Sequence, residues 1–270
     1  MNKELVTEVL IGSDPEMFLY SESLFKYIPV CRLVGGTKEE PLPITDKGHA
    51  IQEDNVAIEF CIPPCKTVDE FVDNINFVKE YIDDTILKPK GLTSKCVASA
   101  IFDEDDLLSP QAAHFGCTPS YNAWTGETMA VERNNPFLRT TGGHIHIGYA
   151  NPEVHTSIEL IKAMDLFLGL QSVLLDDDTA RRQMYGKAGD YRLKKYGVEY
   201  RSLSSFWLQT DELKRWVFEN TLKAINFVNI GGFIGNPDDI QFAINNCDKE
   251  KATEILNDYN IEVFSMAINK

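Results

Sequence analysis

The chain has 270 residues, 25% charged side chains and a formal net charge of −15. This length can bury a sizeable core, and no apolar run is long enough to span a bilayer. The acidic balance argues against broad binding of duplex nucleic acid, which needs a basic face. An acidic enzyme can still bind an anionic nucleotide where metal ions neutralise the contact, although the charge could serve only solubility.

The N-terminus and the cysteines favour a cytoplasmic protein without a membrane partner. The opening sequence MNKELVTEVLIGSDPE has no apolar core followed by a small-residue cleavage site, and it reads as the start of a strand. The six cysteines are scattered and lack the density of a disulfide scaffold. We therefore expect reduced thiols.

The first part of the chain predicts mainly β-strands. Residues 6–20 predict a strand that Gly12 and Pro15 interrupt. Alternating apolar residues predict a strand at 55–62, which the following pair of prolines ends. Further strands are expected at 26–34 and 95–101.

Most of the predicted helices lie in the second half of the chain. Thr67 and Glu70 form a capping box, so we expect a helix from there to about Ile86. The irregular segment 103–140 is long for a passive loop and is a candidate to line a site. Helices are expected at 153–175, extending as far as 185, and at 210–229, 237–245 and 249–257. Strands are expected at 143–149 and 198–203. A loop rich in glycine and basic residues is expected between 186 and 197. These elements predict one α+β domain over residues 1–270.

The first candidate site motif is GSDPEMFLY. Asp14 and Glu16 are two residues apart, so on a strand they share one face. Two adjacent carboxylates repel unless a cation or solvent relieves them. A surface strand would expose both, but the apolar neighbours Ile11, Met17 and Phe18 favour a buried strand and a bound divalent metal.

The segment QEDNVAIEF supplies two more acids. Glu53 precedes an apolar strand, and Glu59 lies within it between Ile58 and Phe60. Alternation places Glu59 on the face opposite to these two apolar side chains. It is either a solvent-facing glutamate on a half-buried sheet or a metal ligand, and the second reading gains weight if this strand lies beside the first.

The segment TGGHIHIGY is more specific. His144 and His146 alternate with isoleucines, so both imidazoles share one strand face. Imidazole binds borderline divalent metals and donates to phosphate when protonated. The preceding Gly142 and Gly143 permit close backbone approach to a ligand. Two structural histidines are the alternative.

The segment GVEYRSLSSFW places Glu199 and Arg201 on one strand face. They could form a simple ion pair, or the acid could hold metal while the guanidinium binds a carboxylate or phosphate bidentately. Just upstream, RRQMYGKAGDYR is either a solvated loop or a basic, glycine-containing loop that holds phosphates. Its basic residues are Arg181, Arg182, Lys187 and Arg192.

These motifs occur in the order acid-x-acid, strand glutamate, His-x-His and Glu-x-Arg. In that order the chain resembles the glutamine-synthetase-like superfamily of carboxylate–amine ligases, and within it most closely the phage-type amidoligase family. The resemblance covers roughly residues 11–207. It implies a glutamine-synthetase catalytic-domain-like fold, in which a curved, mostly antiparallel sheet is flanked by helices. The chain has no room for the separate N-terminal domain of the synthetases, so the oligomeric state is left open.

The resemblance also implies roles for the motif residues. Asp14, His144 and Glu199 would hold a metal ion near the ATP phosphates. Glu16, Glu53 and Glu59 would hold an ion near the acceptor substrate. The implied ATP contacts are His146, Arg181, Arg182 and Arg201, and the implied catalytic residues are Arg201, Arg192 and Lys187.

The implied reaction joins a carboxylate to an amine through an acyl phosphate, with ATP and Mg²⁺ or Mn²⁺ as cofactors. The substrates would be small-molecule or peptide acids and amines, whose identity the motifs leave open. Asp105, Asp106 and Glu127 are candidates to deprotonate the amine. Three alternatives remain: a guanidino-type small-molecule kinase of the same fold, a metal-dependent hydrolase or nuclease that does not use ATP, and a non-catalytic binding or virion component.

Overall fold

The computed structural model describes residues 5–114, 119–131 and 135–265. It combines helices with sheets in which every pairing between described strands is antiparallel, so the predicted α+β class is confirmed. Within those ranges, none of the helices combines the length and the apolar character that crossing a bilayer demands.

The five-stranded sheet has the strand order β1-β11-β13-β12-β9. Its strands are β1 (Leu10–Ser13), β11 (Ile145–Gly148), β13 (Gly197–Tyr200), β12 (Asp190–Lys194) and β9 (Tyr121–Asn122). The predicted loop between 186 and 197 is therefore wrong at residues 190–194. Although its sequence is polar, β12 pairs with β13 in a hairpin, and its Arg192 lies opposite Glu199.

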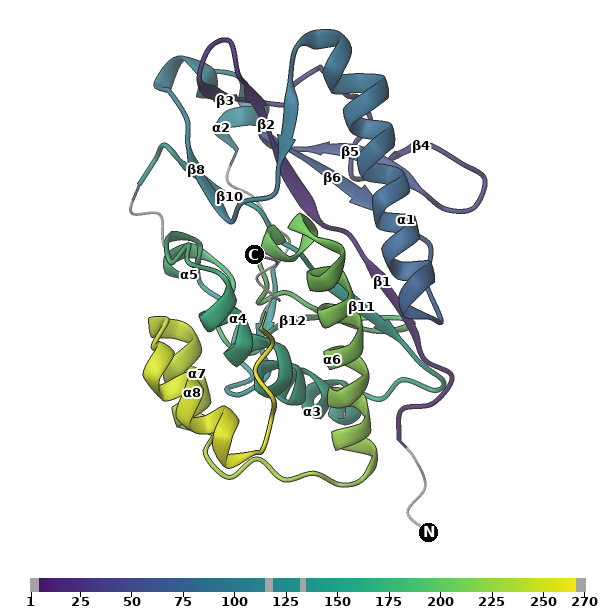
Figure 1. Cartoon of the computed structure of the whole chain (residues 1–270), viewed down its shortest axis with the longest axis vertical. Helices are drawn as coiled ribbons and strands as arrows, with labels where there is room; N and C mark the ends of the chain where they lie inside the picture. Colours follow the sequence, from purple (N-terminus) through teal and green to yellow (C-terminus); the bar gives the residue numbers. More distant parts are fainter. Residues whose placement is uncertain (1–4, 115–118, 132–134, 266–270) are drawn as a thin grey trace.

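The second large sheet has the strand order β3-β2-β6-β5-β4, with β7 also paired to β2. Its strands are β3 (Lys26–Ile28), β2 (Glu16–Ser21), β6 (Ala57–Cys61), β5 (Ala50–Asp54), β4 (Leu42–Pro43) and β7 (Thr93–Lys95). The predicted strand over 6–20 is divided at Asp14 and Pro15, where the chain passes from one sheet to the other. Figure 1 shows β1 and β2 as one long purple ribbon that links the two parts of the molecule.

A small third sheet pairs β10 (Leu138–Thr140) with β8 (Ser99–Ile101). The single strand predicted over 95–101 is therefore two strands, β7 and β8, that belong to different sheets. The irregular segment 103–140 contains only short elements among its described residues: a 3-10 turn at Glu104–Leu107, α2 (Pro110–Ala113), β9 and β10.

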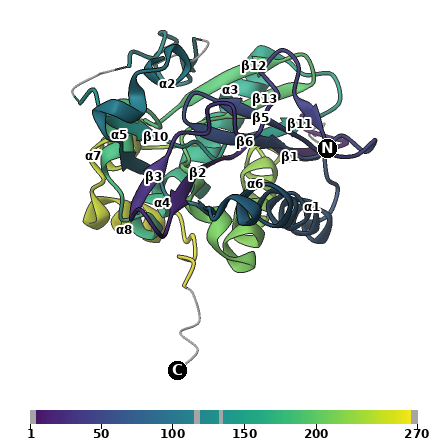
Figure 2. The same ribbon diagram turned by 90° about the horizontal axis from the view of Figure 1, so that it is seen from above.

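The helices pack mainly on one side of the sheets. They are α1 (Val68–Tyr81), α3 (Val154–Met164), α4 (Leu170–Leu175), α5 (Ala180–Met184), α6 (Asp211–Asn229), α7 (Pro237–Asn246) and α8 (Lys249–Asp258). The expected capping box of Thr67 and Glu70 is present at the start of α1. Figure 2 shows α1 and α6 side by side on one side of the strands.

The helix predicted from 153 is confirmed as far as Leu175, because α3 continues through a π-helical segment, η4 (Asp165–Gly169), into α4. Its expected extension to 185 is wrong. Asp176 accepts a hydrogen bond from the Asp178 N–H, and Asp178 accepts one from the Ala180 N–H. Such local side-chain bonds compete with helical backbone bonds, and α5 starts as a separate helix.

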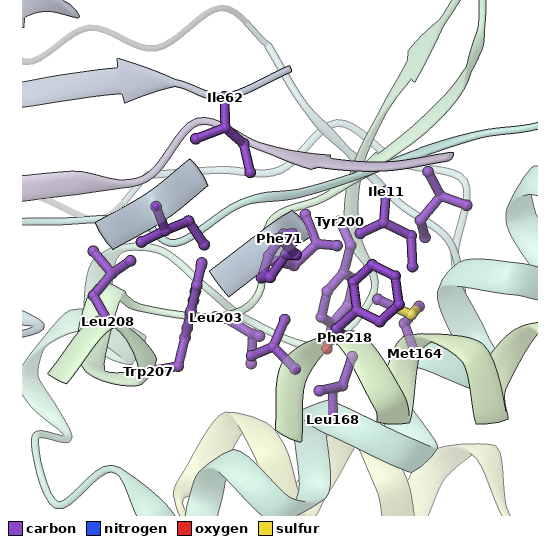
Figure 3. Close-up of a cluster of buried hydrophobic side chains, with 14 of the residues drawn as sticks. Ile11, Ile62, Phe71, Met164, Leu168, Tyr200, Leu203, Trp207, Leu208 and Phe218 are labelled. Carbon is purple, nitrogen blue, oxygen red and sulfur yellow. The ribbon is translucent and has the colours of Figure 1, made fainter. Parts of the chain in front are cut away.

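The main core lies between the five-stranded sheet and the helices. Phe71 of α1 lies between Trp207 and Phe218, with ring centroids 5.8 and 5.5 Å away (Figure 3). On β11 and β13, the residues that enter the core alternate with others that face away from it: Ile145, Ile147, Val198 and Tyr200 are all fully buried in this core. Alternation therefore directs His144, His146, Glu199 and Arg201 to the opposite face, where the candidate site lies.

Candidate functional site

A polar cavity opens between the two large sheets and the paired strands β8 and β10. Its volume is about 130 Å³, which is smaller than the roughly 300–1,000 Å³ of a typical small-molecule site. We call it the main cavity. Its charged and histidine side chains are Asp14, Glu16, Lys38, Asp54, Glu59, His114, Arg139, His144, Arg181, Asp190, Arg192, Lys194 and Arg201.

The first candidate metal group comprises Asp14, His146 and Glu199, whose ligand atoms all lie within 4.8 Å of one another. The sheet explains the meeting, because β11 lies between β1 and β13 and pairs His146 directly with Glu199. Asp14 Oδ1 lies 3.1 Å from His146 Nε2, and neither of these buried atoms has a hydrogen bond. The Tyr196 hydroxyl contacts His146 Nδ1 at 2.7 Å and leaves Nε2 directed into the group.

His144 lies against the same group. Its Nδ1 is 3.2 Å from Asp14 Oδ1 and 3.7 Å from Glu199 Oε1. Burial, together with the nearby Arg201 guanidinium, lowers the pKa of His144 to about 4. The ring is therefore neutral at neutral pH, as a metal ligand must be.

Cations surround Glu199. Arg201 Nη1 is in close contact with Glu199 Oε1, Arg192 Nη1 lies 3.4 Å from the same oxygen, and Lys194 Nζ lies 2.6 Å from Oε2. Burial, the largest influence, would raise the pKa of Glu199, but the charges of Arg201, His144 and His146 together outweigh it and lower this pKa to about 2. This carboxylate is therefore ionised at neutral pH.

The second candidate metal group comprises Glu16, Asp54 and Glu59, whose ligand oxygens also lie within 4.8 Å of one another. Glu16 and Glu59 are direct partners in the β2–β6 pairing. Burial, followed by the Asp54 charge, raises the pKa of Glu16 to about 8. Burial and the neighbouring charges of Asp14 and Glu16 hold the pKa of Glu59 well above its usual range.

Both groups fit a divalent cation. The buried, unbonded atoms of Asp14 and His146 match an oxygen-and-nitrogen donor set, while the second group offers carboxylate oxygens, which suit Mg²⁺ or Mn²⁺. Three neighbouring carboxylates, one buried and two half-buried, are costly to ionise unless a cation neutralises them.

The prediction that Glu53 is a metal ligand is not supported by its place in the structure. Its carboxylate accepts hydrogen bonds from the backbone N–H groups of Arg32, Val34 and Gly35 and from Gln111 Nε2. Neighbouring residues on a strand point to opposite faces, and Asp54 faces the cavity instead. The register of the β5–β6 hairpin explains this orientation. Asp54 lies opposite Ala57, and Ala57 shares its strand face with Glu59, so Asp54 and Glu59 point to the same side.

The predicted phosphate-binding loop also differs. Arg181 lines the main cavity, but it donates to the backbone oxygens of Ser202 and Arg201. Arg182 donates to the Gly186 backbone oxygen and the Ser172 hydroxyl, and neither Arg182 nor Lys187 lines the main cavity. Arg181 and Arg182 therefore brace the turn, and the role of Arg181 at the cavity wall as an ATP contact stays a prediction. Of the predicted catalytic side chains, Arg192 and Arg201 line the cavity.

The glycine pair before the His-x-His strand packs against the protein itself. A Cβ atom at Gly142 would lie 2.3 Å from His144 Nε2, and one at Gly143 would lie 2.3 Å from the Trp207 ring nitrogen. The Gly142 N–H also donates to Glu16 Oε2 at 2.7 Å. The absence of a side chain at Gly142 therefore leaves room for His144, and its N–H holds Glu16 in place. Gly142 also lines the main cavity, so the close approach of this backbone to a ligand stays a prediction.

Of the predicted metal ligands, Asp14, Glu16, Glu59 and His144 line the main cavity, and Glu199 contacts His144 beside it. Sequence reasoning missed Lys38, Asp54, Asp190, Lys194 and Tyr196. The alternation of Arg192 and Lys194 could have revealed Lys194, had β12 been recognised as a strand. Asp105, Asp106 and Glu127 lie outside the lining of the main cavity.

A second, mostly apolar cavity lies beside the first group, and we call it the side cavity. Its lining is Leu10, Gly12, Ser13, Asp14, Cys61, Ile62, Pro64, His146, Gly148 and Tyr196. The rings of His146 and Tyr196 stack there with centroids 6.0 Å apart. Asp14 lines both cavities, so the first metal group forms part of the wall between them.

Comparison with known proteins defines the class as a carboxylate–amine ligase. The chain belongs to the family described as phage phiEco32-like COOH–NH2 ligase type 2, whose model matches residues 128–262. The resemblance to a phage-type amidoligase is thereby confirmed, as is the prediction of a ligase enzyme. The matched segment contains His144, His146, Glu199 and Arg201, while Asp14, Glu16 and Glu59 precede it.

One solved structure with similarity is a bifunctional glutathione synthetase from Pasteurella multocida, with a TM-score of 0.40 and 10% sequence identity. The similarity covers 93% of this chain and 49% of the synthetase, so the chain spans about half the length of that protein. No curated protein matches the chain.

Proposed function

We propose that this protein is an ATP-dependent carboxylate–amine ligase that forms an amide or peptide-like bond through an acyl phosphate. We also propose that residues 1–270 form one glutamine-synthetase-like catalytic domain. The observation that carries the proposal is the pair of candidate metal groups beside Arg201 at one cavity. The family of the chain supplies the reaction class.

The two cavities suggest how ATP and the acid would be arranged. The side cavity offers an apolar lining and the exposed edge of the Tyr196–His146 stack to a nucleotide base. The shared wall at Asp14 and His146 would then face the phosphates. The main cavity, with Arg192 and Arg201, would receive the carboxylate of the substrate, because guanidinium groups bind carboxylate and phosphate well.

The chemistry requires activation of an unreactive carboxylate. Transfer of the γ-phosphoryl group of ATP gives the acid a good leaving group, and attack by the amine then releases phosphate. Divalent cations in the two groups would neutralise charge between the phosphates and the acid. Glu199 holds Arg201 in position, and Arg201 would stabilise the phosphoryl group in transit. An ATP-dependent reaction also fits the cytoplasmic location that we expect.

The test is ADP formation from ATP and Mg²⁺ across a panel of carboxylic acids and amines. We expect one combination to produce ADP together with a product lighter by one water than its two substrates, detected by mass spectrometry. The Glu16→Gln variant serves as the inactive control. ADP accompanied by a phosphorylated product and no amide would favour the small-molecule kinase, and turnover without ATP would favour the hydrolase.

A further inference from the structure

The main cavity contains one carboxylate that neither metal group uses. Five carboxylate residues line it, and four of them are Asp14, Glu16, Asp54 and Glu59. The fifth is Asp190, at the start of β12, which is 4% exposed. Among the described lining residues, Asp190 is thus the carboxylate that remains for a substrate.

The surrounding backbone fixes the position of Asp190. Its carbonyl oxygen accepts a hydrogen bond from the Arg201 N–H at 2.9 Å. The preceding Gly189 has a φ of +74°, and its N–H donates to buried Asp165 at 2.6 Å. A Cβ atom at Gly189 would lie 2.6 Å from the Trp124 ring, so only glycine fits this turn. The carboxylate is therefore preorganised rather than carried on a free loop.

The functional groups of Asp190 and Arg201 face each other across a gap. Asp190 Oδ1 lies 3.9 Å from Arg201 Nε, and both buried atoms lack a hydrogen bond. Arg201 Nη1 is already engaged by Glu199. A buried acceptor and a buried donor left unbonded are costly, so this pair is suited to a ligand that supplies a donor to one and an acceptor to the other.

We propose that Asp190 binds the ammonium group of the amine substrate and removes a proton from it, while Arg201 Nε donates to the acyl oxygen. The inference rests on the proposed ligase function. The protonated amine supplies the donor, and the activated acid supplies the acceptor. Because Oδ1 and Nε lie only 3.9 Å apart, an amine bound to one and an acyl oxygen bound to the other would be neighbours, which is the requirement for reaction.

One proton of R–NH3⁺ passes to the Asp190 carboxylate, and the nitrogen lone pair forms the C–N bond. The bond between the acyl carbon and the phosphate oxygen breaks, and the phosphate leaves with the electron pair. The second amine proton goes to the phosphate as HPO4²⁻, and Asp190 returns its proton to solvent. Burial raises the pKa of Asp190, which makes it a stronger base than an exposed aspartate.

The other acids considered for this role lie elsewhere. Asp106 pairs with Lys26 at 2.5 Å, and Asp105 and Glu127 are exposed. None of the three lines the main cavity. They supply matched control variants, because each loses one carboxylate without changing the cavity.

The first experiment compares two acceptors with the acid that gives the most ADP in the wild type. A primary alkylamine is protonated at neutral pH and needs a base, whereas hydroxylamine is largely unprotonated and does not. We expect Asp190→Asn to reduce amide formation at least about 100-fold, while hydroxamate formation stays within about fivefold of wild type. Glu127→Gln should retain both activities. Equal loss with both acceptors, or no loss with either, would overturn the proposal.

The second experiment does not depend on the acid or on ATP turnover. Crystals of the full chain in Mg²⁺ are soaked in thallium(I), which has the charge and nearly the size of ammonium and scatters anomalously. We expect an anomalous peak in coordination contact with Asp190 in the wild type and its loss in Asp190→Asn. No peak there, or a peak that persists in the variant, overturns the inference. If no acid supports ADP formation, the proposed function fails by itself, and the soak still decides whether the ammonium site exists.

Discussion

The two candidate metal groups hold their acids in opposite electrostatic surroundings. In the first group, Arg201, Arg192 and Lys194 surround Glu199, and its pKa falls to about 2. In the second group, Glu16, Asp54 and Glu59 meet one another, and burial with mutual repulsion raises the pKa of Glu16 to about 8. The first group is therefore stable as a network of protein charges, whereas the second depends on a bound cation to be fully ionised.

Activity should depend on both groups, and this is the largest expected effect. We expect Glu16→Gln and His144→Ala each to reduce ATP turnover at least about 100-fold, because each removes a preorganised charge or ligand at the site. A coupled ADP assay measures the loss, and circular dichroism checks that the variants are folded. Activity like that of the wild type in both variants would contradict the site assignment.

Arg201→Lys should come next, with a loss of about tenfold to 100-fold in kcat/KM. An ammonium group keeps the charge but cannot reproduce the planar fork that contacts Glu199 and reaches Asp190. Steady-state kinetics with the best acid and amine provide the measurement. Near-normal kinetics would show that only the charge of Arg201 matters.

A Glu→Gln substitution should change the free energy of unfolding differently in the two candidate metal groups. Glu199→Gln leaves buried cations without their partner and should lower the free energy of unfolding by about 3 kcal/mol. Glu59→Gln relieves repulsion and should leave the metal-free protein unchanged or more stable by about 1 kcal/mol. Urea unfolding in EDTA measures both. Destabilisation of equal size in the two variants would remove the distinction between the groups.

Metal binding should reveal the second group directly. Mn²⁺ at about 100 times its dissociation constant should stabilise the wild type by about 2.7 kcal/mol. Glu59→Gln should lose most of this stabilisation, because it removes one of three carboxylate ligands. Thermal unfolding with and without Mn²⁺ provides the readout, and an undiminished shift in the variant would exclude Glu59 from the metal site.

The smallest expected effect concerns Glu53 and Asp54. Glu53→Gln should keep activity within about twofold and lower stability by about 1 kcal/mol, because its carboxylate only accepts hydrogen bonds from a neighbouring loop and Gln111. Asp54→Asn should impair Mn²⁺ binding and turnover. If Glu53→Gln impaired Mn²⁺ binding and turnover while Asp54→Asn did not, Glu53 and not Asp54 would be the metal ligand.

The sequence was most informative for strands on which apolar core residues alternate with polar site residues. The alternation in His144–Ile147 and in Val198–Arg201 predicts which side chains share a face, and the structure has Ile145, Ile147, Val198 and Tyr200 in the core. The capping box at Thr67 likewise required only local information. The order of these motifs was sufficient to indicate the ligase family.

Only the tertiary structure decided how those faces meet. Asp14 and Glu16 are two residues apart, yet the change of sheet at Pro15 places them in different metal groups. The exchange of Glu53 for Asp54 follows from the register of a hairpin, and the gap between Asp190 and Arg201 follows from a turn held by buried Asp165. Strand alternation is a local property of the backbone and can be read from the sequence, whereas sheet order, register and burial arise from long-range pairing and had to be observed.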